Sequence, residues 1–135
     1  MKRFLTLFAA MLLALMPQGA MAQLTINWDT MPMLPYRDPP DVLPEMVSYV
    51  AGEYRAKRCP PPPLVAGHRT VRADVAVLLD DDGTVRATVP RAINCVTVEQ
   101  YAAGIVAAAA RNNLLARGIG APGWYRASLT FDWAE

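Results

Sequence analysis

Apolar and polar residues alternate in three segments of the chain, with the period of strands that bury one face. These segments run from Val71 to Asp80, from Val85 to Val89 and from Tyr125 to Trp133. The last is the longest segment in which the two kinds of residue alternate without exception. We therefore expect three strands whose apolar faces line one core.

Helical spacing appears first between Val42 and Lys57, where apolar residues recur three and four positions apart. Asp41 and Pro44 are residues that the start of a helix tolerates. The run Pro60–Pro63 must end this helix, because four prolines remove four amide donors. The pattern predicts a helix over 42–57.

A second helix is predicted from Thr97 to about Arg117. Thr97 and Gln100 have the spacing of a capping box, and Gly118 suits the left-handed position after a helix end. The helix is rich in alanine, which indicates close packing on a sheet. A helix lying on a membrane surface is the alternative, but no lysine-rich polar face supports it.

Between the first two strands lie three consecutive aspartates and a glycine. A loop made of Asp81, Asp82 and Gly83 places Gly83 at the left-handed position of a type I turn with a G1 bulge. It also keeps apolar side chains on one face, through the pairs Leu79–Val85, Val77–Ala87 and Val75–Val89. A calcium loop would need alternating carboxylates and a distant glutamate. We therefore predict a hairpin turn and no metal site.

The predicted order is helix, strand, strand, helix, strand. Two helices suffice to cover one face of a three-stranded sheet. The expected fold is α+β, with a three-stranded antiparallel sheet covered on one face by two helices.

The N-terminal segment changes this picture, because residues 1–22 have the layout of a secretory signal peptide. Lys2 and Arg3 precede an apolar run, and small residues follow, which favours cleavage after Ala22. The alternative is an uncleaved membrane anchor. Residues 23–41 then form a proline-rich leader without periodicity, whose Trp28 and Tyr36 dock on the domain or on a partner. The folded domain is expected over 42–135.

Charge and cysteine content narrow the function classes. Without Lys2 and Arg3 the chain carries 11 basic against 12 acidic residues, so no basic excess favours nucleic acid. Cys59 and Cys95 are the only cysteines, and an even count in an exported chain indicates a disulfide. Two buried free thiols are the alternative.

An enzymatic function is not expected. His68 is the only histidine, and it has no cysteine or acidic residue at ligand spacing. The chain shows no nucleophile–base set and no glycine-rich phosphate loop. We therefore predict neither catalytic residues nor a cofactor.

The strand–DDDG–strand unit, the capped alanine-rich helix and the terminal strand ending in "LTFDW" resemble the C-terminal domain shared by the TonB and TolA proteins. The resemblance covers roughly residues 42–135. The cysteine before the second helix is closer to TolA, and the short chain with its hairpin is closer to TonB. Where TonB domains carry aromatic and proline residues after that helix, this chain has "NNLLARGIGAPG".

The resemblance implies a last strand at the sheet edge, where a partner segment pairs as an added strand. Arg126, Ser128, Thr130 and Asp132 would then tune the choice of partner. An unpaired edge has the main-chain groups for this role. The alternative is an edge that Arg126 and Asp132 merely protect from aggregation.

The expected function is a periplasmic protein-binding or adaptor module whose partner is a protein or peptide of the cell envelope. The alternatives are a short transducer tethered to the inner membrane and a purely structural protein. A homodimer formed by exchange of the terminal strand is a further option.

Overall fold

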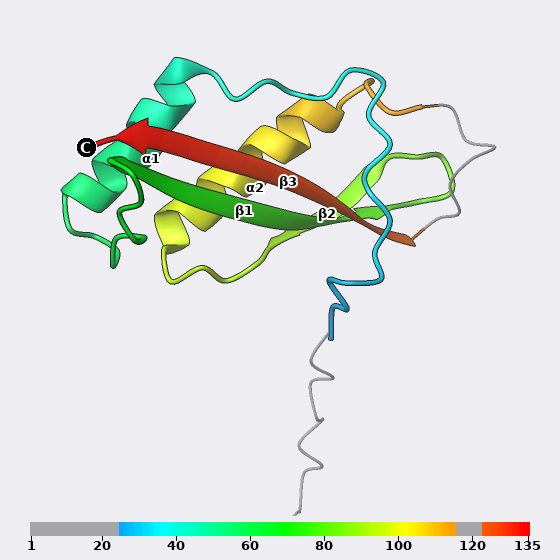
Figure 1. The fold of residues 1–135 in the computed structure, drawn as a ribbon. Helices are drawn as coiled ribbons and strands as arrows, with labels where there is room; N and C mark the ends of the chain where they lie inside the picture. The colour runs from blue at the N-terminus through cyan, green and yellow to red at the C-terminus, as the bar shows by residue number, and fades with distance from the viewer. Residues whose placement is uncertain (1–24, 116–122) are drawn as a thin grey trace, which may run out of the picture.

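The computed structural model describes residues 25–115 and 123–135, in which two helices cover one face of a sheet (Figure 1). The elements in chain order are α1 (Pro44–Arg55), β1 (His68–Leu79), β2 (Val85–Pro90), α2 (Val96–Ala110) and β3 (Gly123–Ala134). The strands lie in the order β2-β1-β3, and both pairs are antiparallel. The α+β fold expected from the sequence is therefore confirmed.

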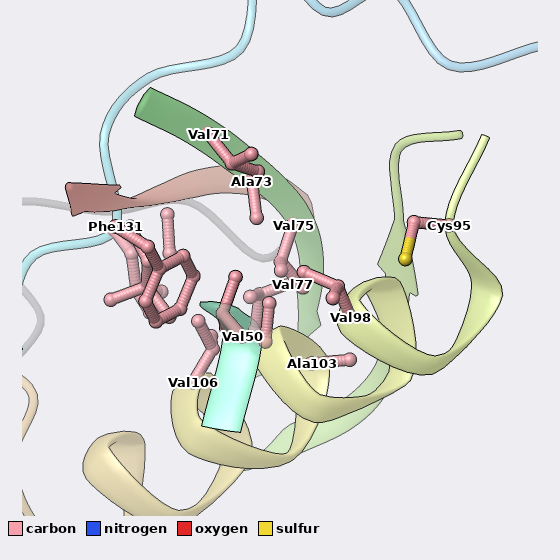
Figure 2. Close-up of a cluster of buried hydrophobic side chains, with 14 of the residues drawn as sticks. Val50, Val71, Ala73, Val75, Val77, Cys95, Val98, Ala103, Val106 and Phe131 are labelled. Atoms are coloured by element: carbon pink, nitrogen blue, oxygen red, sulfur yellow. The ribbon is translucent and has the colours of Figure 1, made fainter. Parts of the chain in front are cut away.

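The core lies between the sheet and the helices (Figure 2). Both long strands bury the face that their alternation predicts, through Val71, Ala73, Val75, Val77 and Leu79 of β1 and Tyr125, Ala127, Leu129, Phe131 and Trp133 of β3. Val50 of α1 and Val106 of α2 are fully buried against them. Ala102, Ala103 and Ala110 are buried too, so small side chains do face the sheet from α2.

The hairpin turn agrees with its prediction, but the pairing beyond it does not. Gly83 has a φ of 77°, and its N–H donates to the Asp80 carbonyl oxygen at 3.0 Å. Leu79 pairs with Val85 as expected. A register shift between Leu78 and Leu79 then moves every later pair by one residue, which gives Val77–Thr88 and Val75–Pro90. The predicted Val77–Ala87 and Val75–Val89 pairs are wrong, because strict alternation does not allow for a bulge.

The start of α2 differs from the predicted capping box. Cys95 is the N-cap residue, and its N–H donates to Glu99 Oε2 at 3.0 Å. Thr97 instead donates its hydroxyl to Glu53 Oε2 of α1 at 2.7 Å. A contact between the two helices has replaced the local cap.

The end of α2 also comes earlier than predicted, at Ala110 and not near Arg117. The Asn113 side chain donates to the Ala109 carbonyl oxygen at 2.9 Å, which satisfies one of the acceptors left at the helix end. The predicted cap residue Gly118 lies outside the described residues. The first helix is shorter than predicted at both ends, and Pro44 begins it.

Residues 25–38, which we call the strap, pack on the domain. In Figure 1 the strap (blue to cyan) passes across the start of β3 and leads on towards α1. Leu34 is 5% exposed and belongs to the core. Burial raises the pKa of the Tyr36 phenol to about 12. The Arg91 guanidinium lies 5.5 Å from the centre of the Trp28 ring, so both aromatic residues of the leader dock on the chain itself.

Candidate partner-binding edge of β3

The outer side of β3 is a sheet edge, because β1 is its only neighbouring strand among residues 25–115 and 123–135. Arg126 shows which main-chain groups point outwards. Its N–H donates to the Pro32 carbonyl oxygen and its carbonyl accepts from the Leu34 N–H, both at 2.8 Å. Main-chain groups alternate sides along a strand. Those of Ser128, Thr130 and Asp132 therefore point away from β1 as well.

The strap covers only the beginning of this edge. Met33 and Arg126 form a parallel bridge, and the strap then turns away, with the Leu115 N–H donating to the Pro35 carbonyl oxygen at 2.8 Å. Within residues 25–115 and 123–135, no backbone group bonds to the outward groups of residues 128–132. We call residues 128–132 the open half of the edge and Arg126 with its strap partners the covered half.

The four residues predicted for partner binding thus fall into two groups. Arg126 is held by the strap, and its guanidinium donates to the Trp28 carbonyl oxygen at 3.2 Å. Ser128, Thr130 and Asp132 lie together on the open half, with side chains on the sheet face opposite the helices. An extended segment would find three outward N–H and three outward C=O groups there.

Asp74 of β1 supports the open half from below, a role that the sequence reading missed. It is 6% exposed, and its Oδ1 accepts from the Ser128 hydroxyl at 2.5 Å and from Arg72 Nε at 2.9 Å. Burial raises the pKa of this carboxyl, but the hydrogen bonds from Ser128 and Arg72 outweigh that effect and leave its pKa below the ordinary value. The signal available in the sequence was an aspartate in the middle of the first predicted strand, two residues after Arg72.

Asp132 is held in a second polar cluster at the far end of the open half. Its carboxylate accepts from the Thr70 hydroxyl at 2.6 Å, and His68 Nδ1 lies 2.7 Å from Oδ1. These two hydrogen bonds hold the pKa of Asp132 below its ordinary value. His68, the first residue of β1, is exposed, and its ring orients the carboxylate of Asp132.

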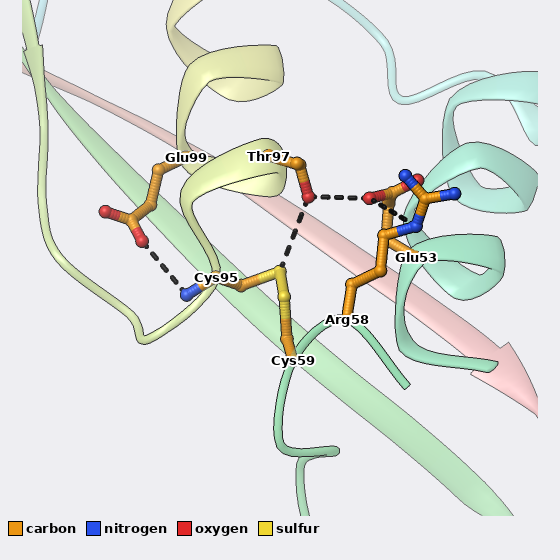
Figure 3. The surroundings of a disulfide bond; sticks show 6 residues. All are labelled: Glu53, Arg58, Cys59, Cys95, Thr97 and Glu99. Atoms are coloured by element: carbon orange, nitrogen blue, oxygen red, sulfur yellow. Dashed lines mark hydrogen bonds and ion pairs between the residues drawn. A yellow bond between two sulfur atoms is a disulfide. The ribbon is translucent and has the colours of Figure 1, made fainter. Parts of the chain in front are cut away.

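The disulfide lies on the helix side of the molecule (Figure 3). The sulfur atoms of Cys59 and Cys95 are 2.06 Å apart, and the bond joins the segment after α1 to the start of α2. Next to it, the Thr97–Glu53 hydrogen bond also joins α2 to α1. The Arg58–Glu53 ion pair, at 3.7 Å, holds the segment that follows α1 against that helix. The predicted pairing of the cysteines is confirmed, and the disulfide ties the end of α1 to the start of α2.

The aspartate loop organises its own backbone. Asp80 Oδ1 accepts from the N–H groups of Asp82 and Thr84, both at 2.9 Å, and Oδ2 accepts from Arg86 Nε at 2.7 Å. The bond from Thr84 is the main reason that the pKa of Asp80 lies below its ordinary value. In the described parts of the chain, no group of three or more histidine, cysteine or acidic residues could hold a metal ion.

The comparisons with known proteins leave the family open. No protein-family model, curated protein or solved structure matches this chain. The resemblance to the TonB and TolA domains therefore stays a prediction from the sequence. As for the membrane, none of the helices in residues 25–115 and 123–135 is long and apolar enough to cross it.

Proposed function

We propose that this chain is a periplasmic protein-binding or adaptor module that receives an extended segment of a partner protein on the open half of β3. The observation that carries the proposal is the strap. Its two main-chain hydrogen bonds to Arg126 are the contacts that an added strand makes, and they stop where the open half begins.

Two further features support a binding edge. The core beneath it is closely packed, since Phe131 is fully buried and Leu129 is 4% exposed. The polar contacts of Asp74 and Asp132 hold the side chains of the open half in place, and they do not involve its outward main-chain groups. A rigid edge loses little conformational entropy when a partner strand binds.

The periplasmic location is part of the proposal. The signal-like segment at residues 1–22 and the Cys59–Cys95 disulfide both fit an oxidising compartment outside the cytoplasm. A tethered transducer would share the binding edge and differ in keeping residues 1–22. The intact mass of the protein from soluble and membrane fractions separates these two forms.

The binding edge is tested by replacing one outward amide. Thr130→Pro removes an N–H that does not bond to β1, and proline is tolerated on edge strands. Thr130→Val keeps the N–H and serves as the matched control. The probe is a short peptide of alternating threonine and valine, and its binding is followed through the amide resonances of the mature protein.

The wild type and Thr130→Val are expected to show resonance shifts centred on residues 128–132. Thr130→Pro should bind about tenfold more weakly, because a main-chain hydrogen bond is lost and a partner carbonyl is left unpaired. Equal binding by all three proteins, or shifts that avoid β3, would contradict the proposal.

A further inference from the structure

Four basic side chains gather around a surface hollow just beyond the end of β3. Arg55, Lys57, Arg58 and Arg69 line this hollow, which has a volume of about 620 Å³, and Glu135 is its only acidic lining residue among those described. Cleavage after Ala22 would leave 11 basic against 12 acidic residues. On that form of the chain, the hollow is a local concentration of positive charge.

Glu135 shows what such a hollow accepts. Its Oε1 receives a hydrogen bond from Arg69 Nε at 2.9 Å, which is the main reason that the pKa of Glu135 lies below its ordinary value. The charge of Arg55 adds to this effect. A carboxylate of the chain itself is thus already bound at one side of the hollow.

The other cations keep donors available. The Arg58 side chain is 62% exposed, and its Nε lies 3.7 Å from Glu53 Oε2. No described residue forms an ion pair with the exposed Lys57 ammonium group. An arginine has five N–H donors and a lysine three. Lys57 and Arg58 could therefore bind further carboxylates without breaking the contacts of the fold.

The hollow lies in line with the open half of the edge. Arg55 donates to the carbonyl oxygen of Ala134 at 3.3 Å, and Ala134 is two residues beyond Asp132. A strand advances about 3.3 Å per residue. A segment paired with residues 128–132 would therefore reach the hollow within its next three or four residues.

We infer that the partner segment carries acidic residues next to its strand-forming part, and that Arg55, Lys57 and Arg58 bind their carboxylates. The inference rests on the proposed function, because the open half of β3 aligns the segment. Main-chain pairing supplies the binding common to any extended peptide, and the hollow selects peptides with an acidic flank.

The test compares two forms of the threonine–valine peptide, one with three glutamates at each end and one with three glutamines. Charged groups at both ends make the result independent of strand direction. We expect the glutamate peptide to bind about five- to tenfold more tightly in low salt. The preference should shrink in about 0.5 M salt, because exposed ion pairs are screened.

Two double variants locate the preference. Lys57→Gln with Arg58→Gln should remove most of it, since only Arg55 of the three cations remains, and should leave binding of the glutamine peptide unchanged. Arg37→Gln with Arg111→Gln removes the same charge from exposed positions away from the hollow, and this control should keep the preference. Equal loss in both double variants would mean that net charge, and not the hollow, selects the peptide.

The outcomes separate this inference from the proposed function. If both peptides bind equally and shift residues 128–132, the inference is overturned and the edge function stands. If the glutamate peptide shifts only the hollow, the edge function fails, and with it the aligned segment inferred here. Binding of neither peptide overturns both. Loss of binding to phosphatidylglycerol vesicles in the Lys57/Arg58 variant, without any peptide preference, would assign the hollow to a lipid surface instead.

Discussion

The covered and open halves of the β3 edge belong to one strand with one alternation of residues, but they differ in the hydrogen-bond partners of their outward main-chain groups. At Arg126 the strap supplies both hydrogen-bond partners. From Ser128 to Asp132 the outward main-chain groups find none among the described residues. Local sequence does not cause this difference, since both halves place polar side chains on the same face of the sheet.

The difference comes from where the strap is anchored. Leu34 enters the core directly after the Met33–Arg126 bridge and draws the chain away from β3. Further on, the Asn113 side chain bonds to both the N–H and the carbonyl of Asp38, at 3.0 and 2.6 Å. An exposed strand edge invites aggregation, and proteins cover it or place charges on it. Here one half is covered, and Asp132 places a charge on the other.

The largest effect on the difference between the two halves is expected from Leu34→Ala. This substitution should release the strap from Arg126 and so open the covered half as well. Loss of a buried leucine costs about 2–4 kcal/mol of unfolding free energy. Urea unfolding measures that loss, and hydrogen exchange should show faster exchange of the Arg126 amide. Met33→Ala is the matched control, because Met33 is 56% exposed and should cost little. A stable Leu34→Ala protein with a protected Arg126 amide would show that the strap does not depend on its anchor.

The features of the fold that depend on residues close together in the chain could be predicted from the sequence. Alternation identified the buried faces of β1 and β3, and the need for a positive φ identified Gly83 as the turn residue. Alternation did not reveal the second bulge of the hairpin, at Arg86, whose side chain is held by Asp80. A prediction from alternation assumes an unbroken ladder of residue pairs between the strands. It takes no account of a side-chain contact across the turn.

Long-range contacts account for the remaining differences. Thr97 has the local pattern of a cap, but Glu53, 44 residues earlier, binds its hydroxyl. The strap has no periodicity, so nothing in its sequence placed Leu34 in the core or Pro32 beside Arg126. The edge residues were therefore predicted as one uniform group. Their division into two halves depends on a segment about 90 residues away in the chain.

A smaller effect is expected at Asp74, which lies below the boundary between the halves. Asp74→Asn weakens the hydrogen bonds to Ser128 and Arg72 and should cost about 1–2 kcal/mol at neutral pH. The folded-state pKa of Asp74 is lowered, so its carboxylate stabilises the fold above about pH 4. That contribution is lost as the pH falls through the lowered pKa.

Unfolding free energies measured between about pH 7 and pH 2 test this prediction for Asp74. The wild type should lose more stability on acidification than Asp74→Asn. The exposed Asp41→Asn serves as a control that removes a carboxylate elsewhere, and it should follow the wild type. Parallel curves for the wild type and Asp74→Asn would mean that the buried carboxylate is not favoured in its charged form.

The smallest effect is expected at Asp132. Its measurement tests whether the charge of this residue protects the open half from pairing with a second copy of the chain. An antiparallel pair of two copies centred on Thr130 would place Asp132 opposite Ser128 of the second copy, and each copy would bring a charge to the seam. Asp132→Asn keeps an acceptor for Thr70 but removes the charge, so weak dimerisation should increase severalfold in sedimentation experiments at neutral pH.

The wild type should show the same tendency only in acid. Because hydrogen bonds from Thr70 and His68 lower the pKa of Asp132, its charge persists below the ordinary range for aspartate, and self-association should begin only there. Asp38→Asn, on the strap, provides the control with the same change in net charge. If Asp132→Asn and this control associate equally, the charge of Asp132 does not prevent self-association at the edge. The strap would then be the feature that limits pairing along β3, and the open half would be too short to hold a second copy.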